Sequence, residues 1–395
     1  AYSDHSSKWI LGQIASVTES STGKVMESNT YNPTTAMLTT MSKFGLLQQT
    51  MTYNADGTVA SRKDGRNYTT AYSNYKAGIP QYVSYPDATS ERAVVNSLGQ
   101  IVSLTNAAGT TTSLEYDPVG RLKRISYPAA DTVAWNATTL TAEQVFSPEY
   151  GLPSGHWRQT VSTGNARTIT YLDGLWRPVL TRTFDLANEA GTRRMTLRRF
   201  DFNSNPVFES YAQRTINDIG ENPAGTSTVY DALGRVTSES AASELGNLTT
   251  TTNYLGGFIK QVTNPRGHTT TMRFMAFDQP VDTMPVRIEQ PNSIASDINR
   301  DVFGNKIYII RGNGSEQASR QYVYDAHMRL CKTLEPESGA TVQAYDAASN
   351  VAWRASGQGL PSNTSCDTPS VLAARKINYS YDAMNRLTST TFGDG

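Results

Sequence analysis

The chain has 395 residues, of which 38% are hydrophobic and 18% charged, and its formal net charge is zero. This balance argues against a nucleic-acid-binding protein, which usually carries a basic stripe, and against disorder, which combines low hydrophobicity with high net charge. No apolar run approaches the roughly 18 residues of a membrane-spanning helix, so no membrane span is expected in this sequence.

Residues 1–24 are expected to form a lead-in segment that precedes the repeats. Residues 1–10 lack the charged and apolar regions of a signal peptide, so any targeting signal is expected outside this sequence. Regular repeats are expected over residues 25–127. Their marks are large apolar residues spaced 20 to 22 positions apart, namely Tyr31, Tyr53, Tyr75, Val95 and Tyr116.

A second signal, Asp or Asn followed three residues later by Gly, accompanies these marks. It occurs at residues 54–57, 96–99, 106–109, 117–120, 264–267 and 301–304. An Asp or Asn side chain accepts a hydrogen bond from the backbone two residues on, and Gly takes the left-handed φ that closes such a hairpin loop. About six or seven residues remain between turns, rich in Thr, Ser, Val and Tyr, which is an ordinary strand. The pattern predicts a long antiparallel meander with two strands per repeat.

One string recurs along the chain: Tyr-Asp, two further residues, then Gly-Arg. Two copies are complete, at Tyr116, Asp117, Gly120 and Arg121 and at Tyr230, Asp231, Gly234 and Arg235. Degenerate copies lie at Tyr324, Asp325 and Arg329, at Tyr345 and Asp346, and at Tyr381, Asp382 and Arg386. We interpret every member as structural: the tyrosines form a ladder along the sheet, the aspartate caps the turn, the glycine supplies left-handed φ, and the arginine pairs with a carboxylate or stacks on a ring. Where Met328 replaces the glycine, we expect a different loop at 325–329.

The regular repeat is interrupted in the middle of the chain. Residues 128–170 are expected to form an insertion, with a short helix at 138–146 capped by Thr138 or Thr139. Repeats of irregular spacing are expected over 171–353. Insertions in a repeat protein usually become loops on one face of the array.

The last part of the chain carries the second cysteine and an unfinished repeat. Residues 354–378 are expected to form a polar loop that contains Cys366, and 379–395 to start a further repeat of a longer polypeptide. A disulfide between Cys331 and Cys366 would contribute roughly 3 to 4 kcal/mol by closing a loop. The strand-rich, polar composition is typical of extracellular proteins, which favours this disulfide over two unrelated buried thiols.

These repeats resemble those of the YD-repeat, or RHS-repeat, family. The resemblance rests on the Tyr-Asp-x-x-Gly-Arg strings, their degenerate copies, and half-repeats such as Asn-Pro-Arg-Gly at 264–267. It covers the chain from about residue 25 to its end. The family includes bacterial polymorphic toxins, the shell-forming C components of insecticidal toxin complexes, and teneurins. The resemblance implies an all-β fold, a long antiparallel meander of YD-repeat hairpins coiled into a spiral, shell- or barrel-like β-sheet.

The resemblance also implies a partner and a location. The chain would be part of a wall around a C-terminal toxic cargo of the same longer polypeptide, in a bacterial protein that is secreted or at the cell surface. Family shells that release a toxin carry an aspartyl autoprotease downstream of the repeats. This sequence contains no such region, so the fragment is not expected to cleave itself.

No residue pattern points to catalysis, a cofactor or a metal site. None of the histidines has zinc-like spacing to another histidine or to a cysteine; they are His5, His156, His268 and His327. The sequence has no nucleophile elbow, phosphate-binding loop or dinucleotide fingerprint. We therefore expect a protein without enzymatic activity.

Two functions remain open from the sequence. The first is encapsulation of the C-terminal cargo, which predicts a cleaved C-terminal segment. The second is adhesion, in which an extracellular scaffold binds cell-surface glycans or protein receptors through its loops. Tryptophans in or beside loops could stack on sugar rings, although packing between strands is the favoured interpretation of them. They are Trp9, Trp135, Trp157, Trp176 and Trp353.

Overall fold

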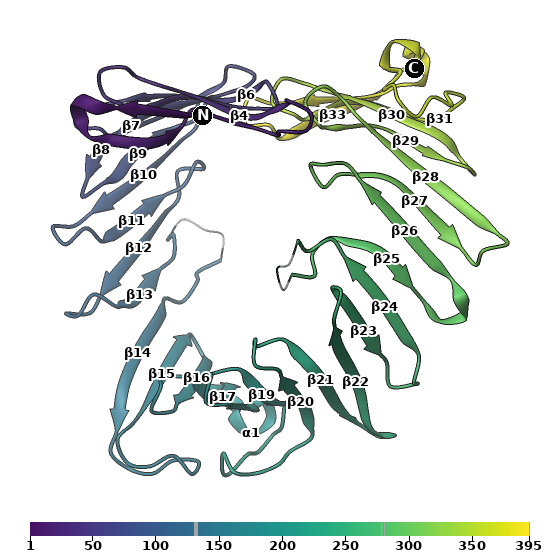
Figure 1. The fold of residues 1–395 in the computed structure, drawn as a ribbon. Helices are drawn as coiled ribbons and strands as arrows, with labels where there is room; N and C mark the ends of the chain where they lie inside the picture. Colours follow the sequence, from purple (N-terminus) through teal and green to yellow (C-terminus); the bar gives the residue numbers. More distant parts are fainter. Residues whose placement is uncertain (130–132, 278, 280, 395) are drawn as a thin grey trace. The chain divides into compact units, whose positions relative to one another are not determined.

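The regular secondary structure of the protein consists mainly of β-strands. The computed structural model describes residues 1–129, 133–277, 279 and 281–394. Strands take up 55% of the residues and helices 5%. The expected all-β class, built as a long antiparallel meander, is therefore confirmed (Figure 1).

Strands pair with their neighbours in sequence. The clearest case is the pair of strands Thr138–Val145 (β14) and His156–Thr163 (β15), which are aligned along their whole length, from Thr138 opposite Thr163 to Val145 opposite His156. Such neighbour pairing follows from tight turns, because antiparallel strands can be joined by a short hairpin.

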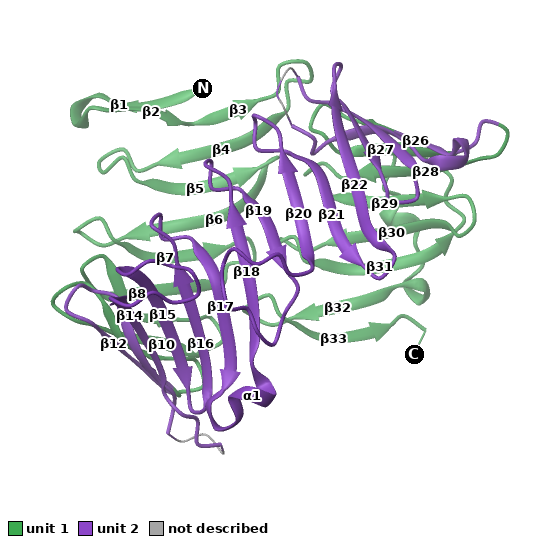
Figure 2. Cartoon of the chain, turned by 90° about the horizontal axis from the view of Figure 1, so that it is seen from below, with its two compact units in different colours: residues 1–110, 298–311, 315–395 green, residues 111–297, 312–314 purple. Residues whose placement is uncertain are grey.

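The contacts divide the chain into two compact units, which we describe separately (Figure 2). Unit 1 comprises residues 1–110, 298–311 and 315–395, and unit 2 comprises residues 111–297 and 312–314. Unit 1 therefore combines the first repeats of the chain with the last ones.

Unit 1 holds two stretches of strands. The first stretch is β1 (Tyr2–His5), β2 (Ile10–Ile14), β3 (Ser16–Thr18), β4 (Val25–Tyr31), β5 (Leu38–Lys43), β6 (Leu46–Tyr53), β7 (Val59–Asp64), β8 (Thr69–Lys76), β9 (Ile79–Ser84), β10 (Ser90–Val95) and β11 (Ile101–Thr105). The second is β27 (Lys306–Gly312), β28 (Gln317–Tyr324), β29 (Leu330–Glu335), β30 (Gly339–Tyr345), β31 (Val351–Gln358), β32 (Ile377–Tyr381) and β33 (Leu387–Phe392). Short 3₁₀ turns lie at η1 (Ser6–Lys8), η4 (Thr368–Ser370) and η5 (Ala373–Arg375).

Unit 2 holds the strands between these stretches. They are β12 (Thr111–Tyr116), β13 (Leu122–Ser126), β14, β15, β16 (Ala166–Leu172), β17 (Pro178–Asp185), β18 (Arg194–Phe200), β19 (Pro206–Ser210), β20 (Gly225–Tyr230), β21 (Val236–Ser243), β22 (Gly246–Leu255), β23 (Ile259–Thr263), β24 (Thr269–Phe274) and β25 (Pro285–Glu289). The strand β26 (Ala295–Arg300) crosses the boundary between the units, and so does β27, whose last residue, Gly312, belongs to unit 2. Helical turns lie at η2 (Leu186–Asn188), α1 (Glu189–Thr192) and η3 (Pro291–Ser293).

The short helix expected at 138–146 is wrong, because these residues form strand β14. Its threonines are β-branched, and β14 pairs with β13 on one side and β15 on the other. Cross-strand packing decides the conformation of such a segment more strongly than a local capping signal does.

Each unit has a small buried core. In unit 2, Tyr171, Leu180, Met195 and Leu197 are buried on β16 to β18, and Ile216 covers them from the long loop after β19. The core of unit 1 is formed by Ala340, Val342, Ala355 and Val371, where Val371 comes from the loop after β31. Long loops therefore cover apolar patches of the strands, as expected for insertions in a repeat sheet.

The hairpin loops alternate between the two ends of the strands. All the turns capped by an aspartate of the motif follow even-numbered strands, so within each unit they lie on one edge of the meander, which we call the motif edge. These turns are residues 117–121, 173–177, 201–205, 231–235, 301–305, 325–329, 346–350 and 382–386. We call the opposite ends the return edge; in the first part of unit 1 it carries loops 44–45, 65–68 and 85–89.

Candidate functional site: the motif turns and the edge contact

The motif turn is held together by its aspartate. At Asp231 one carboxylate oxygen accepts the backbone N–H groups of Leu233 and Arg235, at 2.9 and 3.0 Å, and the other accepts Nε of Arg235 at 2.8 Å. Gly234 has φ +74°, the left-handed conformation that Gly adopts at low cost. The strands on either side shift register at Tyr230, which lies opposite Val236. The turn is therefore a capped hairpin loop with a β-bulge.

The same geometry recurs in the other copies. The capping aspartates are Asp117, Asp173, Asp201, Asp301, Asp325, Asp346 and Asp382. In the copy at Asp346, Asn350 replaces the arginine and donates its side-chain amide to the aspartate at 2.9 Å. A short polar side chain can thus take over the cap contact of the arginine.

The different loop expected at 325–329 is wrong. Met328 adopts φ +58°, and Asp325 accepts the backbone N–H groups of His327 and Arg329, both at 2.9 Å, as in the glycine-containing turns. A left-handed conformation costs a residue with a Cβ roughly 1 to 2 kcal/mol. The hydrogen bonds to the aspartate outweigh this cost, so the cap rather than the glycine determines the turn.

In several turns the arginine reaches into the next repeat. Nε of Arg329 is held by its own Asp325 at 2.8 Å, while Nη1 donates to the backbone carbonyl of Asp346 at 3.1 Å. Its guanidinium also stacks on Tyr345, 4.6 Å from the ring centroid. Arg235 stacks on Tyr254 in the same way, at 4.0 Å. The arginine therefore links consecutive repeats as well as closing its own turn.

The tyrosine hydroxyl supplies a second link, in the opposite direction. Tyr345 donates at 2.6 Å to the carbonyl of Leu330, the residue directly after the preceding motif turn. The equivalent donors are Tyr230, Tyr254, Tyr324 and Tyr381, which bond to the carbonyls of Pro206, Val236, Lys306 and Val351. Sequence reasoning treated the tyrosines as a ladder of rings and missed the hydroxyl bond. The sequence separation between tyrosine and acceptor varies from 15 to 30 residues, so no fixed spacing signalled this bond.

Charges in the turns are stabilised locally. Hydrogen bonds from the side chain and backbone of Arg235 hold the pKa of Asp231 below its usual range. At Asp173 burial raises the pKa, but hydrogen bonds from Arg177 and Leu175 outweigh burial, so the pKa is lowered. Burial raises the pKa of Tyr345, which keeps its hydroxyl protonated as a donor.

In unit 1 the motif edge of the last strands lies against the return edge of the first strands. Nδ1 of His327 is 2.9 Å from the carbonyl oxygen of Phe44. The ring of Phe44 also packs edge-on against Phe303, with centroids 5.3 Å apart. Residues almost 300 positions apart in sequence are thus in direct contact.

Arg66 is the most connected residue of this edge contact. Its guanidinium donates to the side-chain oxygen of Asn385 at 3.0 Å and to the carbonyl of Tyr381 at 3.2 Å. Its Nε lies 3.7 Å from a carboxylate oxygen of Asp346. Asn385 in turn donates to Asp64 at 3.0 Å. The contact is therefore specific and polar, with several partners for one partly buried guanidinium.

A third loop continues the series. Arg386 pairs with Asp87 at 2.7 Å, beyond the contacts of Arg66. Successive loops of the return edge thus contact successive motif turns, in the same order along the chain. These loops are 44–45, 65–68 and 85–89. Both edges repeat once every two strands, roughly 10 Å, so their loops come at matching intervals.

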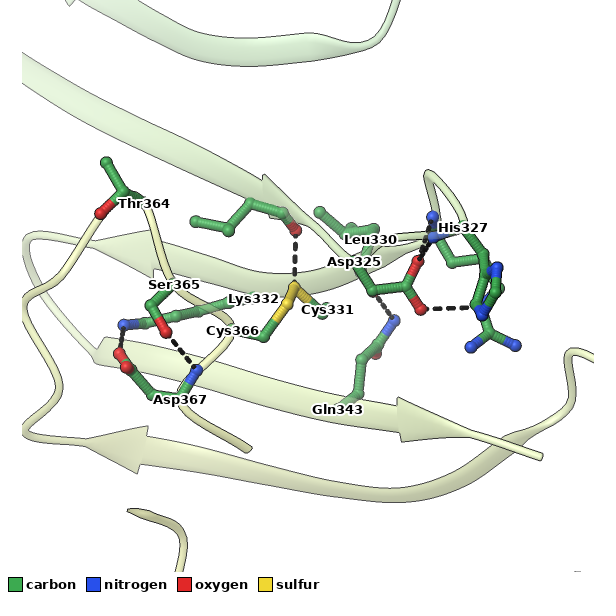
Figure 3. Close-up of a disulfide and its surroundings, with 12 residues drawn as sticks. Asp325, His327, Leu330, Cys331, Lys332, Gln343, Thr364, Ser365, Cys366 and Asp367 are labelled. Atoms are coloured by element: carbon green, nitrogen blue, oxygen red, sulfur yellow. Dashed lines mark hydrogen bonds and ion pairs between the residues drawn. A yellow bond between two sulfur atoms is a disulfide. The ribbon is translucent and has the colours of Figure 1, made fainter. Parts of the chain in front are cut away.

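The loop after β31 is fastened to the sheet by a disulfide and a buried ion pair (Figure 3). Cys331 of β29 is bonded to Cys366, with Cα atoms 5.4 Å apart. The neighbouring Lys332 is fully buried, with 0% of its surface exposed, and Nζ donates to Asp367 and to the carbonyl of Ser362. Both partners of this buried lysine come from the loop, so the loop is required to neutralise it.

The tryptophans occupy different environments. Trp9 is 85% exposed, and Trp135 and Trp176 are also exposed. Trp157 lies in β15, where its ring is 5.1 Å from that of Trp176, and Trp353 lies half-buried in β31. Two of the five tryptophans are thus parts of strands.

A polar groove of about 460 Å³ lies on unit 2 beside strands β18 to β21. Its lining includes Arg194, Glu209, Tyr211, Tyr230 and Glu239. Aromatic rings next to carboxylates and an arginine are side chains that can contact a sugar by stacking and hydrogen bonding.

Among the described residues, no three His, Cys, Asp or Glu side chains are grouped so that they could hold a metal ion. No helix in the described part of the chain is both long and apolar enough to cross a membrane.

Comparison with known proteins identifies the repeats. Residues 96–132 match the model of the RHS repeat. The recognition of YD-repeats, or RHS-repeats, in this sequence is confirmed by this match. The curated proteins contain no significant match to the sequence.

Solved structures match this chain at low sequence identity. A Tc holotoxin pore from Photorhabdus luminescens matches with a TM-score of 0.50 and 12% identity, over 93% of this chain and 18% of that chain. A crystal structure of a TcdB2–TccC3 complex matches with a TM-score of 0.49 and 12% identity, over 87% of this chain and 20% of that chain. This chain therefore spans about a fifth of the length of the chains that it matches.

Proposed function

We propose that this RHS-repeat chain is a segment of a structural β-sheet wall that encloses a C-terminal cargo of the same longer polypeptide. The motif turns act as the joints of the wall. Each aspartate closes one hairpin, arginines such as Arg329 connect their hairpin to the next, and the tyrosine hydroxyls connect theirs to the preceding one.

The observation that carries the proposal is the edge contact of unit 1. A flat meander would leave both of its edges in solvent. Here the motif edge of the last repeats packs on the return edge of the first repeats, through Phe44, Arg66 and Asp87. Lateral packing between repeats so distant in sequence is what a coiled sheet requires, because successive turns of the coil meet along the loop ends of their strands.

The comparison supports the proposal at the level of the fold. The solved protein from Photorhabdus luminescens is described as a Tc holotoxin pore. By analogy of fold, we place this protein in a bacterial toxin assembly that is secreted or at the cell surface. The disulfide between Cys331 and Cys366 supports an oxidising, extracellular environment.

The wall needs no catalytic group of its own. We propose that the recurrent aspartates serve to cap turns, since each accepts backbone and side-chain hydrogen bonds from its own loop. Catalysis, if the complete polypeptide has any, is assigned in this proposal to other regions of that polypeptide.

The test is a mass measurement on the full-length polypeptide purified from its source. Encapsulation predicts one intact mass under native conditions and two pieces after denaturation, a large repeat piece and a smaller C-terminal piece. A single uncut chain under both conditions would contradict a retained, cleaved cargo.

Adhesion is the second proposal, favoured by the polar groove of unit 2 and by the exposed Trp9. It predicts saturable binding of the full-length polypeptide to a glycan in an array screen. Replacing Tyr211 by Ala would then abolish that binding while leaving the thermal midpoint near that of the parent. No bound glycan in the screen would contradict adhesion through this groove.

A further inference from the structure

The loop between β31 and β32, residues 359–376, is fastened to a strand that neither of its ends adjoins. Cys366 of the loop is bonded to Cys331 of β29, which lies beyond β30 in the sheet (Figure 3). The next residue of each partner forms the buried ion pair of Lys332 with Asp367. Both links therefore hold one short stretch of the loop on β29.

The ladder between β31 and β32 is short, and we call this boundary the seam. β31 is paired with β32 at Trp353 and Arg354 alone, whereas β32 is paired with β33 along its whole length. Beyond the two pairs, Val371 of the loop belongs to the cluster that buries Ala355 of β31. The loop therefore supports the seam where strand pairing ends.

The loop has little apolar surface with which to stay in place. Within residues 359–376, all of which the structure describes, Val371 is the one buried side chain, and Leu372 is 72% exposed. Ordering a segment of this length costs conformational entropy at every residue. The ion pair offsets little of that cost, because taking two charges out of water opposes their attraction. The disulfide is therefore the link that decides whether the loop remains on β29.

The disulfide is open to a thiol from the side of the loop. Cys331 is 1% exposed, but Cys366 is only half-buried. A thiolate of the reductant attacks Sγ of Cys366, the S–S bond breaks, and Cys331 leaves as a thiolate that takes up a proton. Its Sγ lies 3.2 Å from the carbonyl oxygen of Val323, so the new thiol has an acceptor in place. A second thiol of the reductant then frees Cys366 as a thiol, and the reductant, having given up two electrons, becomes a disulfide.

The seam also passes through the edge contact of unit 1. The guanidinium of Arg66 donates to the carbonyl of Tyr381, the last residue of β32, at 3.2 Å. Its Nε lies 3.7 Å from a carboxylate oxygen of Asp346, which follows β30. Arg66 thus contacts both sides of the seam, and opening the seam separates its partners.

Resting on the proposed wall, we infer that the bond between Cys331 and Cys366 is a redox switch that keeps the seam closed and lets it open when a dithiol reduces the bond. The seam is closed in an oxidising environment, where disulfides persist. In a compartment rich in thiols the loop leaves β29, the two pairs at Trp353 and Arg354 lose their support, and the edge contact at Arg66 is lost with them.

Hydrogen exchange of the full-length polypeptide, measured by mass spectrometry with and without dithiothreitol, tests the inference. We expect peptides from both sides of the seam, covering residues 351–358 and 376–381, to exchange at least about tenfold faster after reduction. Peptides of the hairpin β14–β15 in unit 2 should keep their rate. Unchanged exchange at the seam, faster exchange in the loop 359–376 alone, or an equal rise in β14–β15 would each overturn the switch.

A variant that carries both Cys331→Ala and Cys366→Ala is the control for this bond. We expect it to exchange at the seam like the reduced parent, with or without dithiothreitol. Slow exchange in the variant would assign the effect to another disulfide of the polypeptide and overturn the inference. Exchange does not depend on a cleaved cargo, so the mass measurement can fail while the switch stands, and the reverse.

Discussion

Replacing Gly65 by Ala probes the edge contact of unit 1 directly. Gly65 lies in loop 65–68 of the return edge. A Cβ on this residue would be 2.2 Å from the carbonyl oxygen of Ala347 and 3.0 Å from that of Leu47. Both neighbours are backbone atoms, so no flexible side chain can move away. The loop must withdraw from the motif turn at 346–350 or strain both segments.

The expected cost is set by the severity of this overlap. Overpacking a well-packed site costs typically 1 to 3 kcal/mol, and a clash with backbone belongs near the upper end, about 3 kcal/mol. Unit 1 has about 200 residues, and a change of 1 kcal/mol moves the midpoint of a domain of that size by roughly 2 to 4 °C. We therefore expect Gly65→Ala to lower the unfolding midpoint of unit 1 by about 6 to 12 °C.

Differential scanning calorimetry of the parent and the variant measures the shift. Gly174→Ala is the matched control: Gly174 also lies in a hairpin loop, but a Cβ there meets no atom within 4 Å. We expect this control to stay within about 0.5 kcal/mol of the parent. Equal midpoints for Gly65→Ala and Gly174→Ala would refute the edge contact as a close-packed interface.

Three further predictions concern the motif and the disulfide. Tyr345→Phe removes the hydroxyl bond to the preceding repeat and should cost about 1 kcal/mol in urea unfolding; an unchanged transition would contradict the linking role. Arg235 lowers the pKa of Asp231 in the folded state. The stability that Asp231 contributes to the fold is therefore fully present above its unfolded pKa of about 3.9, and it is lost as the pH falls through its pKa in the folded state. The midpoint of thermal unfolding should therefore fall as the pH is lowered from 6 to 2, and it should fall less steeply for Asp231→Asn than for the parent. Parallel pH profiles of the parent and the variant would argue against the cap by Asp231. Reduction of the bond between Cys331 and Cys366, which are 35 positions apart, should cost about 3 to 4 kcal/mol and speed tryptic cleavage of the loop, whereas equal cleavage before and after reduction would show that the loop is held without it.

The sequence was sufficient for features that depend on a few consecutive residues. The cap of Asp231, the left-handed Gly234 and the pairing of neighbouring strands all follow from interactions within a hairpin. Such interactions involve four or five residues, and their chemistry is readable from the residue types. The all-β meander follows because the same hairpin is repeated along the chain.

Local signals failed where tertiary contacts compete with them. Residues 138–146 carry capping threonines, yet β14 is a strand because β13 and β15 offer hydrogen-bond partners on both sides. Met328 takes a left-handed conformation because Asp325 supplies enough hydrogen bonds to offset the cost. In both places the surroundings outweigh an intrinsic preference of about a kilocalorie per mole.

The contacts most relevant to function were decided by the tertiary structure alone. Nothing near Arg66 in the sequence indicates that its partners are Tyr381 and Asn385, more than 300 residues away. The residues around Lys332 in the sequence also give no indication that it is buried and paired with Asp367 of a distant loop. The repeat sequence determines the conformation of each hairpin, because the hydrogen bonds that stabilise a hairpin lie within it. Which edges meet depends on how the curvature of many successive strand pairs accumulates, and each pair contributes only a small twist.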